Sequence, residues 1–213
     1  TICVYNWGLI TLETCWVNYE NLVQYSSSVA GLAAHFQIGV REAGTLTVRV
    51  GGAAEACEAA KPFRGVMGKT VVHAGGAGNG QAAKICNNML LGISMIGVSE
   101  AFNLADKLGL DRQALFDISS TASGQCWSLT TYCPVPGPVP TSPANRDYKA
   151  GFTGAMMLKD LNLAQEAART TGTATPLGAG AQQLYTLFAA DGQADRDFSA
   201  IIEYLRGGKA DAE

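Results

Sequence analysis

The sequence lacks the features that are typical of metal-binding, nucleic-acid-binding, membrane-spanning and dinucleotide-binding proteins. Only two of its 213 residues are histidines, and none of its six cysteines forms a C-x-x-C pair, so no metal site is expected. The net charge of −3 favours neither nucleic acid nor an anionic membrane as a partner. No apolar run reaches the ~18 residues of a membrane span. The dinucleotide fingerprint G-x-G-x-x-G does not occur anywhere in the sequence.

What the sequence does contain is enough apolar material for a sizeable core, because 47% of its residues are hydrophobic and 15% are charged. The opening TICVYNWGLITLETCW has neither the basic flank nor the small-residue cleavage site of a secretory signal. We interpret the six cysteines as free thiols in a reducing compartment. The expected location is therefore the cytoplasm.

Three zones follow one another along the chain. Residues 1–43 are rich in aromatic residues and cysteine, and the segment LETCWVNYENLVQYSSSVAGLAAHF within them could form a helix with irregular apolar spacing. In residues 44–75, TLTVRVGG and KTVVHAGG each predict a strand that ends in a glycine turn, with a short helix AAEACEAAKPF between them. This β-α-β spacing allows two parallel strands, which are too few for a sheet that is stable alone.

From residue 78 onward the sequence predicts helices. The longest spans about Asn79–Leu108 with almost no polar interruption, and a helix that is apolar nearly all round is expected to be central and buried. Gly109 favours its C-cap, and Asp111 favours the N-cap of a second helix, DRQALFDISSTA. An irregular loop with five of the seven prolines follows, and further helices are expected at about 153–171, 176–191 and 197–206.

A glycine turn, a lysine and two asparagines open the long helix, in the stretch GAGNGQAAKICNNMLLG. Phosphate binding is one interpretation, a packing turn before a core helix is a second, and catalysis is a third. The glycine spacing is not that of a dinucleotide fingerprint, which argues against a phosphate cradle. Lys84 and Asn88 are four residues apart, so a helix places both on one face.

Lys84 and Asn88 together suit proton transfer to and from an alcohol. A lysine among apolar residues would be partly desolvated, which fits acid–base use, and an asparagine can both donate and accept when it orients a hydroxyl or carbonyl. The alternative is that Lys84 reaches into solvent and the asparagines pair with neighbouring backbone. The spacing alone favours this simpler interpretation.

Three segments carry a resemblance to a known family, namely GAGNGQAAKICNNMLLGISMIGVSEAFNLADKLGLD, SSTASGQCWSLTTYCPVPG and FTGAMMLKDLNLAQEAA. Over about residues 44–207 the sequence resembles the β-hydroxyacid dehydrogenases, and its C-W-S and Y-x-P-V-P-G residues are similar to the 3-hydroxyisobutyrate branch. The resemblance implies NAD-dependent oxidation of 3-hydroxyisobutyrate to methylmalonate semialdehyde, a step of valine catabolism, with NADP as the other possible cofactor.

The resemblance also implies roles for five residues. Lys84 opens the family's K-x-x-N-N motif and is the implied general acid/base, and Asn88 is the implied substrate-binding asparagine. Lys159, in the K-D-L motif, would bind near the nicotinamide, although a plain exposed helix residue is the alternative. Trp127 and Phe152 would wall the substrate pocket, and both could equally be core aromatics.

The sequence departs from the family at its N-terminal side. The family begins with a full Rossmann domain that carries the fingerprint, and its substrate-binding D-A-P-V-S-G-G segment is replaced here by GLAAHFQIGVREAG. We find no resemblance to the family in residues 1–37. The alternative to an enzyme is therefore a truncated, non-catalytic remnant that folds and self-associates without binding cofactor. We expect little or no turnover from the chain in isolation.

The expected fold is mainly α. A helical domain of the 6-phosphogluconate dehydrogenase C-terminal type should occupy residues 76–207, and residues 1–75 should hold an atypical segment and a small α/β remnant of a Rossmann domain. The family builds its oligomers through apolar helix faces of this helical domain, so a homo-oligomer is expected. The other expected partner is a small 3-hydroxy acid, with no nucleic acid and no membrane.

Overall fold

The computed structural model describes residues 3–5, 33–35, 47–52 and 70–207. By its internal contacts the chain divides into two units, residues 1–86 and 87–213, and the division falls inside one long helix. Because that helix is continuous from Asn79, the backbone has no break in regular structure where the contacts divide. The expected boundary between residues 75 and 76 stays a prediction.

Two parallel strands, β3 (Thr47–Val50) and β4 (Thr70–His73), lie at the C-terminal side of the first unit. Thr47 pairs with Thr70, and the pairing continues in register to the ends of both strands. The β-branched residues before glycine turns therefore predicted both strands correctly, and the β-α-β spacing correctly allowed a parallel pair. The short helix that we expected between them lies outside the described residues.

A second parallel pair joins β1 (Cys3–Tyr5) to β2 (Ala33–His35). The sequence did not predict these strands. β2 lies at the end of the segment that we considered for a helix, so that interpretation is wrong at residues 33–35. Strands of three residues carry too little period-2 alternation to be recognised from the sequence.

The glycine turn before the long helix packs closely against the glycines that follow β3. The Gly52 N–H donates to the Gly75 carbonyl over 2.8 Å, and a Cβ added to Gly51 would lie 2.6 Å from the Gly80 nitrogen. Two backbones can approach so closely only where side chains are absent. These contacts favour a packing role for this turn over a phosphate cradle.

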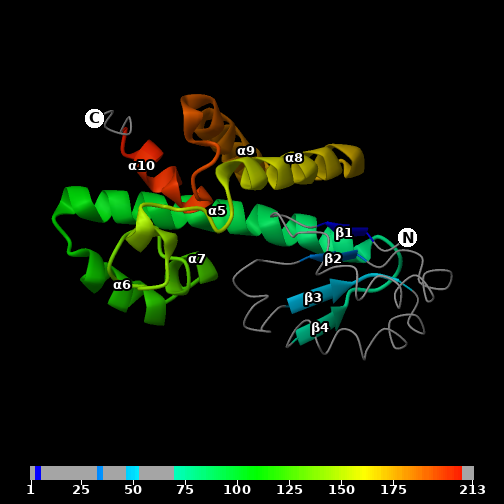
Figure 1. The fold of residues 1–213 in the computed structure, drawn as a ribbon, viewed down its shortest axis with the longest axis horizontal. Coiled ribbons are helices and arrows are strands. Elements are labelled where there is room, and N and C mark those ends of the chain that lie inside the picture. Colours follow the sequence, from blue (N-terminus) through cyan, green and yellow to red (C-terminus); the bar gives the residue numbers. More distant parts are fainter. Residues whose placement is uncertain (1–2, 6–32, 36–46, 53–69, 208–213) are drawn as a thin grey trace, which may run out of the picture. The chain divides into compact units, whose positions relative to one another are not determined.

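The long helix α5 (Asn79–Leu108) has the bounds that the sequence predicted, and it is the central helix of the C-terminal part. Figure 1 shows that the helices that follow it in the chain lie on both sides of it. The first side holds α8 (Gly154–Thr171), α9 (Pro176–Phe188) and α10 (Ile201–Leu205), and the second holds α6 (Arg112–Thr121) and α7 (Trp127–Thr130). The mainly helical fold agrees with the prediction, although the sequence analysis missed the short helix α7.

Short polar residues and glycines set the ends of these helices, as the sequence predicted for the turn after α5. Gly109 takes a positive φ of 74°, and the Asp111 side chain accepts from the Ala114 N–H as the N-cap of α6. α8 is built in the same way, because the Thr153 side chain caps its first turn and Gly172 ends it with a φ of 68°.

The core lies where α5 meets α8, α9 and the segment before α10. At Gly92, α5 lies close to α8, because a Cβ added to it would lie 3.2 Å from the side chains of both Met157 and Leu161. Large side chains that are at most 2% exposed fill the space around this crossing; they are Met95, Phe102, Met157, Leu161, Tyr185, Phe188, Phe198, Ile201 and Ile202. The crossing fixes how far α8 stands from α5.

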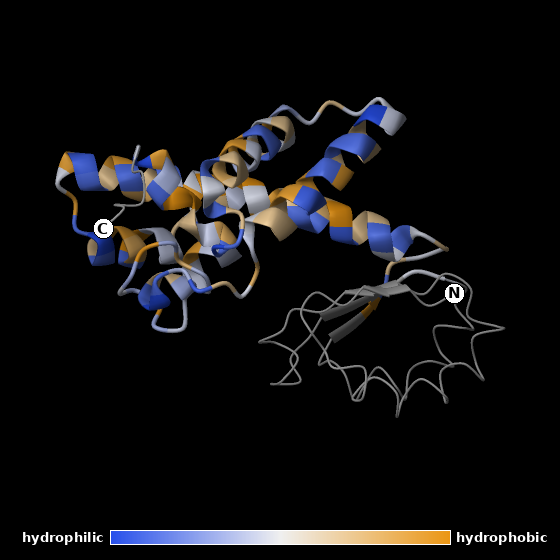
Figure 2. Ribbon diagram, turned by 45° about the horizontal axis from the view of Figure 1, so that its top comes forward, coloured by the Kyte–Doolittle hydropathy of each residue, from blue (hydrophilic) through white to orange (hydrophobic). Residues whose placement is uncertain are grey.

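One face of α5 is not covered in the described structure. Leu90, Leu104 and Leu108 are 64%, 60% and 74% exposed, so the expectation of a helix buried all round is wrong. Figure 2 shows hydrophobic and hydrophilic residues mixed around the helix. Within the described residues, α5 is the one helix that is long and apolar enough to cross a membrane, which corrects our expectation that no segment reaches that length. Core helices of soluble proteins meet the same criterion.

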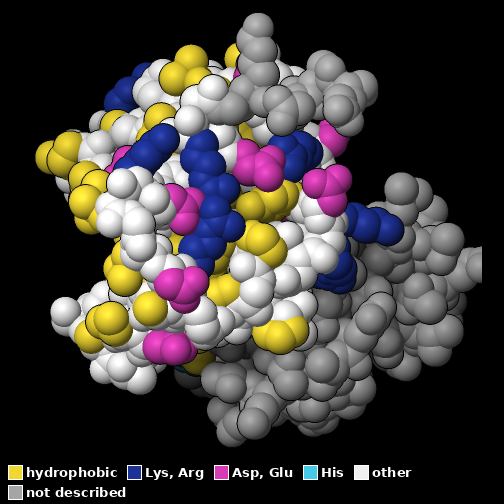
Figure 3. All heavy atoms as spheres, turned by 90° about the vertical axis from the view of Figure 1, so that its left-hand side faces the viewer, with side chains coloured by type: hydrophobic (Ala, Val, Ile, Leu, Met, Phe, Trp, Pro, Cys, Tyr) yellow, Lys and Arg dark blue, Asp and Glu magenta, His cyan; other side chains and the backbone are white. Residues whose placement is uncertain are grey.

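A network of charged side chains ties the C-terminal end of α5 to α6 and α10. Asp106 accepts two hydrogen bonds from Arg112, at 2.9 and 2.8 Å, and a third from Arg206 at 2.9 Å. The hydrogen bond from Arg112 is the main reason that the pKa of Asp106 lies below its usual range. Figure 3 shows basic and acidic side chains next to one another on this face. The network is partly exposed, so it contributes modestly to stability.

Candidate functional site

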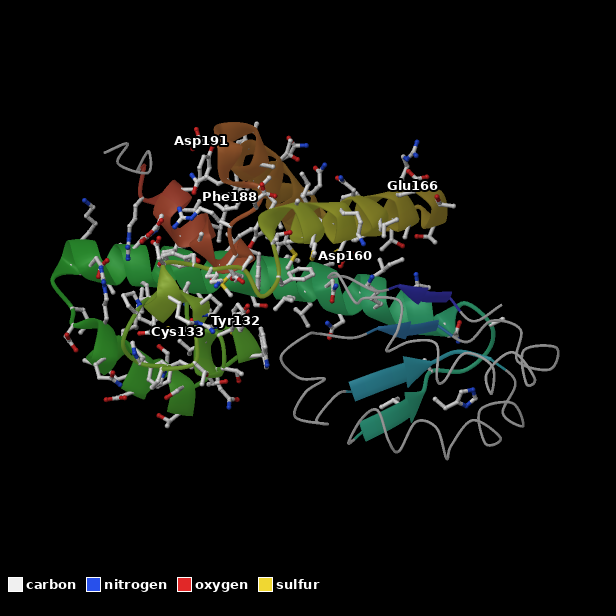
Figure 4. The ribbon with its side chains drawn as sticks, in the orientation of Figure 1. Tyr132, Cys133, Asp160, Glu166, Phe188 and Asp191 are labelled. Carbon is white, nitrogen blue, oxygen red and sulfur yellow. The ribbon has the colours of Figure 1, made fainter. Side chains whose placement is uncertain are left out.

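A buried polar pair joins α5 to α8. The Asn88 side-chain amide donates to Asp160 Oδ2 over 2.6 Å, and the two residues are 4% and 2% exposed. Figure 4 shows Asp160 on the side of α8 that faces α5. Because an ionised carboxylate only accepts, this bond requires the NH₂ group of Asn88 to point toward Asp160. Asn87 donates to Asn88 Oδ1 over 3.0 Å, so both ends of the amide are held.

Lys84 lies one turn before Asn88 on α5 and is only 5% exposed. The simpler interpretation, in which this lysine reaches into solvent, is therefore wrong. A buried amine is retained in a protein only where polar groups surround it. Helix geometry places Lys84 and Asn88 on the same face of α5, one turn apart.

Lys159 lies beside the buried pair, and we call Lys84, Asn88, Lys159 and Asp160 the polar cluster. Its Nζ is 3.3 Å from Asp160 Oδ1, and its side chain is 36% exposed, compared with 3% for Asp160. The alternative of a plain solvent-facing lysine therefore does not describe it. Asp160 contacts Asn88, the predicted substrate-binding residue, through Oδ2, and it contacts Lys159, the predicted cofactor-binding residue, through Oδ1. The carboxylate thus fixes Lys159 and Asn88 relative to each other.

The two predicted wall residues, Trp127 and Phe152, lie in one aromatic row. Trp127 stacks on Tyr132 with ring centroids 4.9 Å apart, and Tyr132 in turn stacks on Phe198 at 5.4 Å. Phe152 meets Phe198 edge to face at 5.6 Å. Trp127 is 40% exposed, so it is not a core aromatic and its ring is open to a ligand. We call these four side chains the aromatic row.

The row and the polar cluster are connected through α8. The helix begins two residues after Phe152, and it carries Lys159 and Asp160 in its second turn. The polar cluster supplies groups that bind a hydroxyl and move a proton, and the row supplies an apolar surface. Together they match the needs of a small molecule that has both a hydroxyl and an alkyl part.

Burial raises the pKa of three tyrosine hydroxyls in and around the aromatic row. The pKa of Tyr132 and that of Tyr185 lie well above the usual value of 10, and the carboxylate of Asp197 adds to the effect of burial in both. Burial is also the main reason that the pKa of Tyr148 rises to about 12. The Tyr132 hydroxyl donates to Asp197, that of Tyr185 to the Phe198 carbonyl, and that of Tyr148 to the Pro134 carbonyl.

We expect the free energy of unfolding to fall steeply above about pH 10, where unfolded tyrosine ionises. The folded chain then holds protons that the unfolded chain has lost, so a rise in pH favours unfolding. Each such group contributes up to about 1.4 kcal/mol per pH unit, or roughly 4 kcal/mol for the three together. Urea unfolding at about pH 8 and pH 11 measures this difference, and equal stability at both values would contradict it.

The sequence analysis missed Asp160, although a signal was present. Asp160 follows Lys159 in the K-D-L motif, and on α8 it occupies the buried face that also holds Met157, Leu161 and Ala164. A carboxylate at a helical position that period 3.6 assigns to the core must have a buried partner. That rule identifies Asp160 as a functional candidate, but it does not identify Asn88 as its partner.

A nicotinamide cofactor fits only part of what the structure describes. At the polar cluster, Lys159 presents a partly exposed ammonium beside the buried pair, which suits the nicotinamide end. A pyrophosphate needs a cradle of free backbone N–H groups. In the described ranges, Gly52 packs against Gly75 and Gly51 against Gly80, whereas Gly76 and Gly78 are exposed. The polar cluster therefore fits the reacting end of the cofactor, and the packed glycines do not offer their backbone to its phosphates.

Comparison with known proteins shows which family this chain is similar to. Residues 78–205 match a family model described as the NAD-binding domain of NADP-dependent 3-hydroxyisobutyrate dehydrogenase. A protein of Mycobacterium tuberculosis named probable 3-hydroxyisobutyrate dehydrogenase is 53% identical over 170 residues, which are 80% of this chain and 57% of the relative. The structure of M. tuberculosis 3-hydroxyisobutyrate dehydrogenase with L-serine superposes with a TM-score of 0.78 at 50% identity, covering 82% of this chain and 60% of that one.

The comparisons also correct one statement about the N-terminal segment. A probable mitochondrial 3-hydroxyisobutyrate dehydrogenase of Arabidopsis thaliana is 43% identical over 194 residues, which are 90% of this chain and 54% of the relative. A match of that extent must include part of residues 1–37, where we found no resemblance. The chain spans little more than half the length of these relatives. By the family model and by these identities, the chain belongs to the 3-hydroxyisobutyrate dehydrogenase family.

Proposed function

We propose that this chain takes part in the oxidation of 3-hydroxyisobutyrate to methylmalonate semialdehyde with NAD or NADP, in valine catabolism. The observation that carries the proposal is the buried lysine Lys84, one helical turn from an asparagine that Asp160 holds in one orientation over 2.6 Å. The family membership supports the substrate class. The aromatic row supports an alkyl-bearing substrate.

Each residue has one task in the proposed reaction. Lys84 acts as general base, because its Nζ takes the hydroxyl proton of the substrate and returns it in the reverse direction. Asn88 binds the substrate's polar end, and Asp160 keeps its amide from rotating. Trp127 and Phe152 exclude water from the alkyl side. NAD or NADP, when bound beside Lys159, supplies the acceptor for the hydride that leaves the carbinol carbon.

The proposal is tested by incubating this chain with 3-hydroxyisobutyrate and either NAD or NADP. Turnover by the chain alone is expected to be low, and any reduced nicotinamide should form together with the semialdehyde, in equal amounts, and only with the hydroxy acid present. Equilibrium dialysis with each cofactor and with the substrate should accompany the assay. A chain that binds neither substrate nor cofactor would refute the proposal.

A second candidate function is the remnant that folds and self-associates without cofactor. The close packing of Gly51 and Gly52 against Gly80 and Gly75 favours it, because those glycines are then not open to a pyrophosphate. The same dialysis separates the two candidates. Binding of 3-hydroxyisobutyrate without binding of NAD or NADP would support a remnant that keeps the substrate half of the site.

We further infer that the chain forms a homo-oligomer through the exposed face of α5. Leu90, Leu104 and Leu108 follow one stripe of the helix, with Gly97 and Ala101 also exposed between them. A second copy could cover the stripe, since the small residues let another helix approach closely. Sedimentation should give a species larger than the 22.2 kDa chain. Leu104→Glu should shift it toward the monomer, and a parent that is monomeric at high concentration would refute the inference.

We also infer that the protein works in the cytoplasm. Cys86, Cys126 and Cys133 are free thiols in the structure, which suits a reducing compartment. Cell fractionation tests this, and recovery of the protein with an organelle or a membrane would contradict it.

A further inference from the structure

Asp197 is a fully buried carboxylate that accepts hydrogen bonds from five donors. Oδ2 accepts from the Tyr132 hydroxyl at 2.9 Å, the Gly151 N–H at 3.0 Å and the Phe152 N–H at 3.2 Å. Oδ1 accepts from the N–H and the hydroxyl of Ser199, at 3.0 and 2.7 Å. As the N-cap of the short helix η3 (Phe198–Ala200), Asp197 needs only the bonds to Ser199. The three hydrogen bonds to Oδ2 are therefore not part of this N-cap.

Two of the three donors on Oδ2 belong to members of the aromatic row, and the third is the N–H of Gly151, the residue before Phe152. Tyr132 is the ring on which Trp127 stacks, and Phe152 is tied through its own backbone N–H. Phe198, the ring between Tyr132 and Phe152, follows Asp197 in the chain, and its N–H donates to the Phe152 carbonyl over 2.9 Å. All four rings of the row are thus held by one carboxylate or by a neighbour bonded to it.

Ring stacking alone would not fix the row. Aromatic pairs are held over a range of separations and angles, so the packing of four rings leaves freedom to slide. Hydrogen bonds to an ionised acceptor are shorter, stronger and more directional. A single oxygen that gathers a side-chain hydroxyl and two backbone N–H groups sets the gap between the segments that carry Trp127 and Phe152.

We propose that Asp197 is a positioning residue for substrate recognition, because it fixes the aromatic row against which the alkyl branch of a small 3-hydroxy acid packs. The proposal rests on the proposed function for the identity of the ligand. It goes beyond that function by placing the control of substrate fit on a residue that touches neither the substrate nor Lys84.

The test compares two variants, each of which removes one hydroxyl group that donates a hydrogen bond to Asp197. Tyr132→Phe removes the bond to Oδ2 and keeps the ring, whereas Ser199→Ala removes the hydroxyl bond to Oδ1 and keeps the Ser199 N–H bond. Both are made in a Trp7→Phe, Trp16→Phe background, so that Trp127 is the sole tryptophan. The readouts are acrylamide quenching of Trp127 and its fluorescence change on titration with 3-hydroxyisobutyrate. Far-UV circular dichroism shows that each variant is folded.

Tyr132→Phe is expected to make Trp127 at least about twofold easier to quench and to weaken 3-hydroxyisobutyrate binding by about fivefold to tenfold, which corresponds to one lost hydrogen bond. Ser199→Ala is expected to change neither readout by more than about twofold, although both variants melt at lower temperature. Asp197→Asn should behave like Tyr132→Phe, because asparagine still caps Ser199 but turns an NH₂ group toward the three other donors.

Equal effects of Tyr132→Phe and Ser199→Ala, or no effect of Tyr132→Phe, would overturn the proposal and leave Asp197 as a purely structural acceptor. The two proposals fail in different ways. A parent chain that does not respond to 3-hydroxyisobutyrate contradicts the proposed substrate, whereas the quenching contrast between the variants still decides whether Asp197 holds the row.

Discussion

Turnover with 3-hydroxyisobutyrate is expected to fall by roughly 10²- to 10⁴-fold when Lys84 is replaced by alanine, the usual range for the loss of a positioned general base. The amine is buried one turn from Asn88, so no exposed side chain can take its place from solvent. Steady-state rates with saturating NAD or NADP measure the effect. We expect it in kcat, because alanine removes the proton acceptor and leaves the Asn88 amide that binds the substrate.

Lys107→Ala is the matched control for this prediction. Lys107 lies on the same helix, in its last turn, and is exposed. It should leave kcat unchanged within about twofold. If Lys84→Ala retained the parent's kcat, Lys84 would be a structural lysine and the assignment of the general base would be wrong.

Asn88→Asp is expected to destabilise the chain by about 3–5 kcal/mol, the usual cost of an uncompensated charge in a buried pair. It would place a second carboxylate 2.6 Å from Asp160 Oδ2, at a site where both residues are at most 4% exposed. Two carboxylates in such contact cannot both ionise without strong repulsion. The free energy of unfolding in urea, at neutral pH, measures the loss.

The double variant Asn88→Asp, Asp160→Asn should recover most of the stability, to within roughly 2 kcal/mol of the parent, because it restores one amide and one carboxylate with donor and acceptor exchanged. Gln125→Glu serves as a control, since it also turns an amide into a carboxylate but at an exposed residue. If Asn88→Asp cost no more than Gln125→Glu, the buried pair would not hold α5 to α8.

The sequence predicted the elements that local chemistry decides. α5 was found at its bounds, because a largely apolar helical pattern ends at a glycine, and an aspartate at the right distance begins the next helix. β3 and β4 were found because β-branched residues alternate before glycine turns. The three-residue strands β1 and β2 and the four-residue helix α7 were missed, because so few residues show no period.

The candidate site was predictable only in part. Lys84, Asn88 and Lys159 came from motif resemblance and helix spacing, yet neither determines whether a side chain is buried. Asp160 and Asp197 were missed because their roles depend on partners 72 and 65 residues distant, Asn88 and Tyr132. Contacts of that separation arise from the packing of helices, and one sequence without structure does not contain them.

The contact at Gly92 has a consequence for how this family can vary. Gly92 lies one turn after Asn88, and α8 rests on its bare backbone through Met157 and Leu161. Because Gly92 has no side chain, it lets α8 lie close enough to α5 for the 2.6 Å hydrogen bond between Asn88 and Asp160. A larger residue at position 92 would push the two helices apart and lengthen this bond without altering any polar atom. A substitution at this apolar position, natural or engineered, would therefore change how the Asn88 amide is held, even though no catalytic group had been replaced.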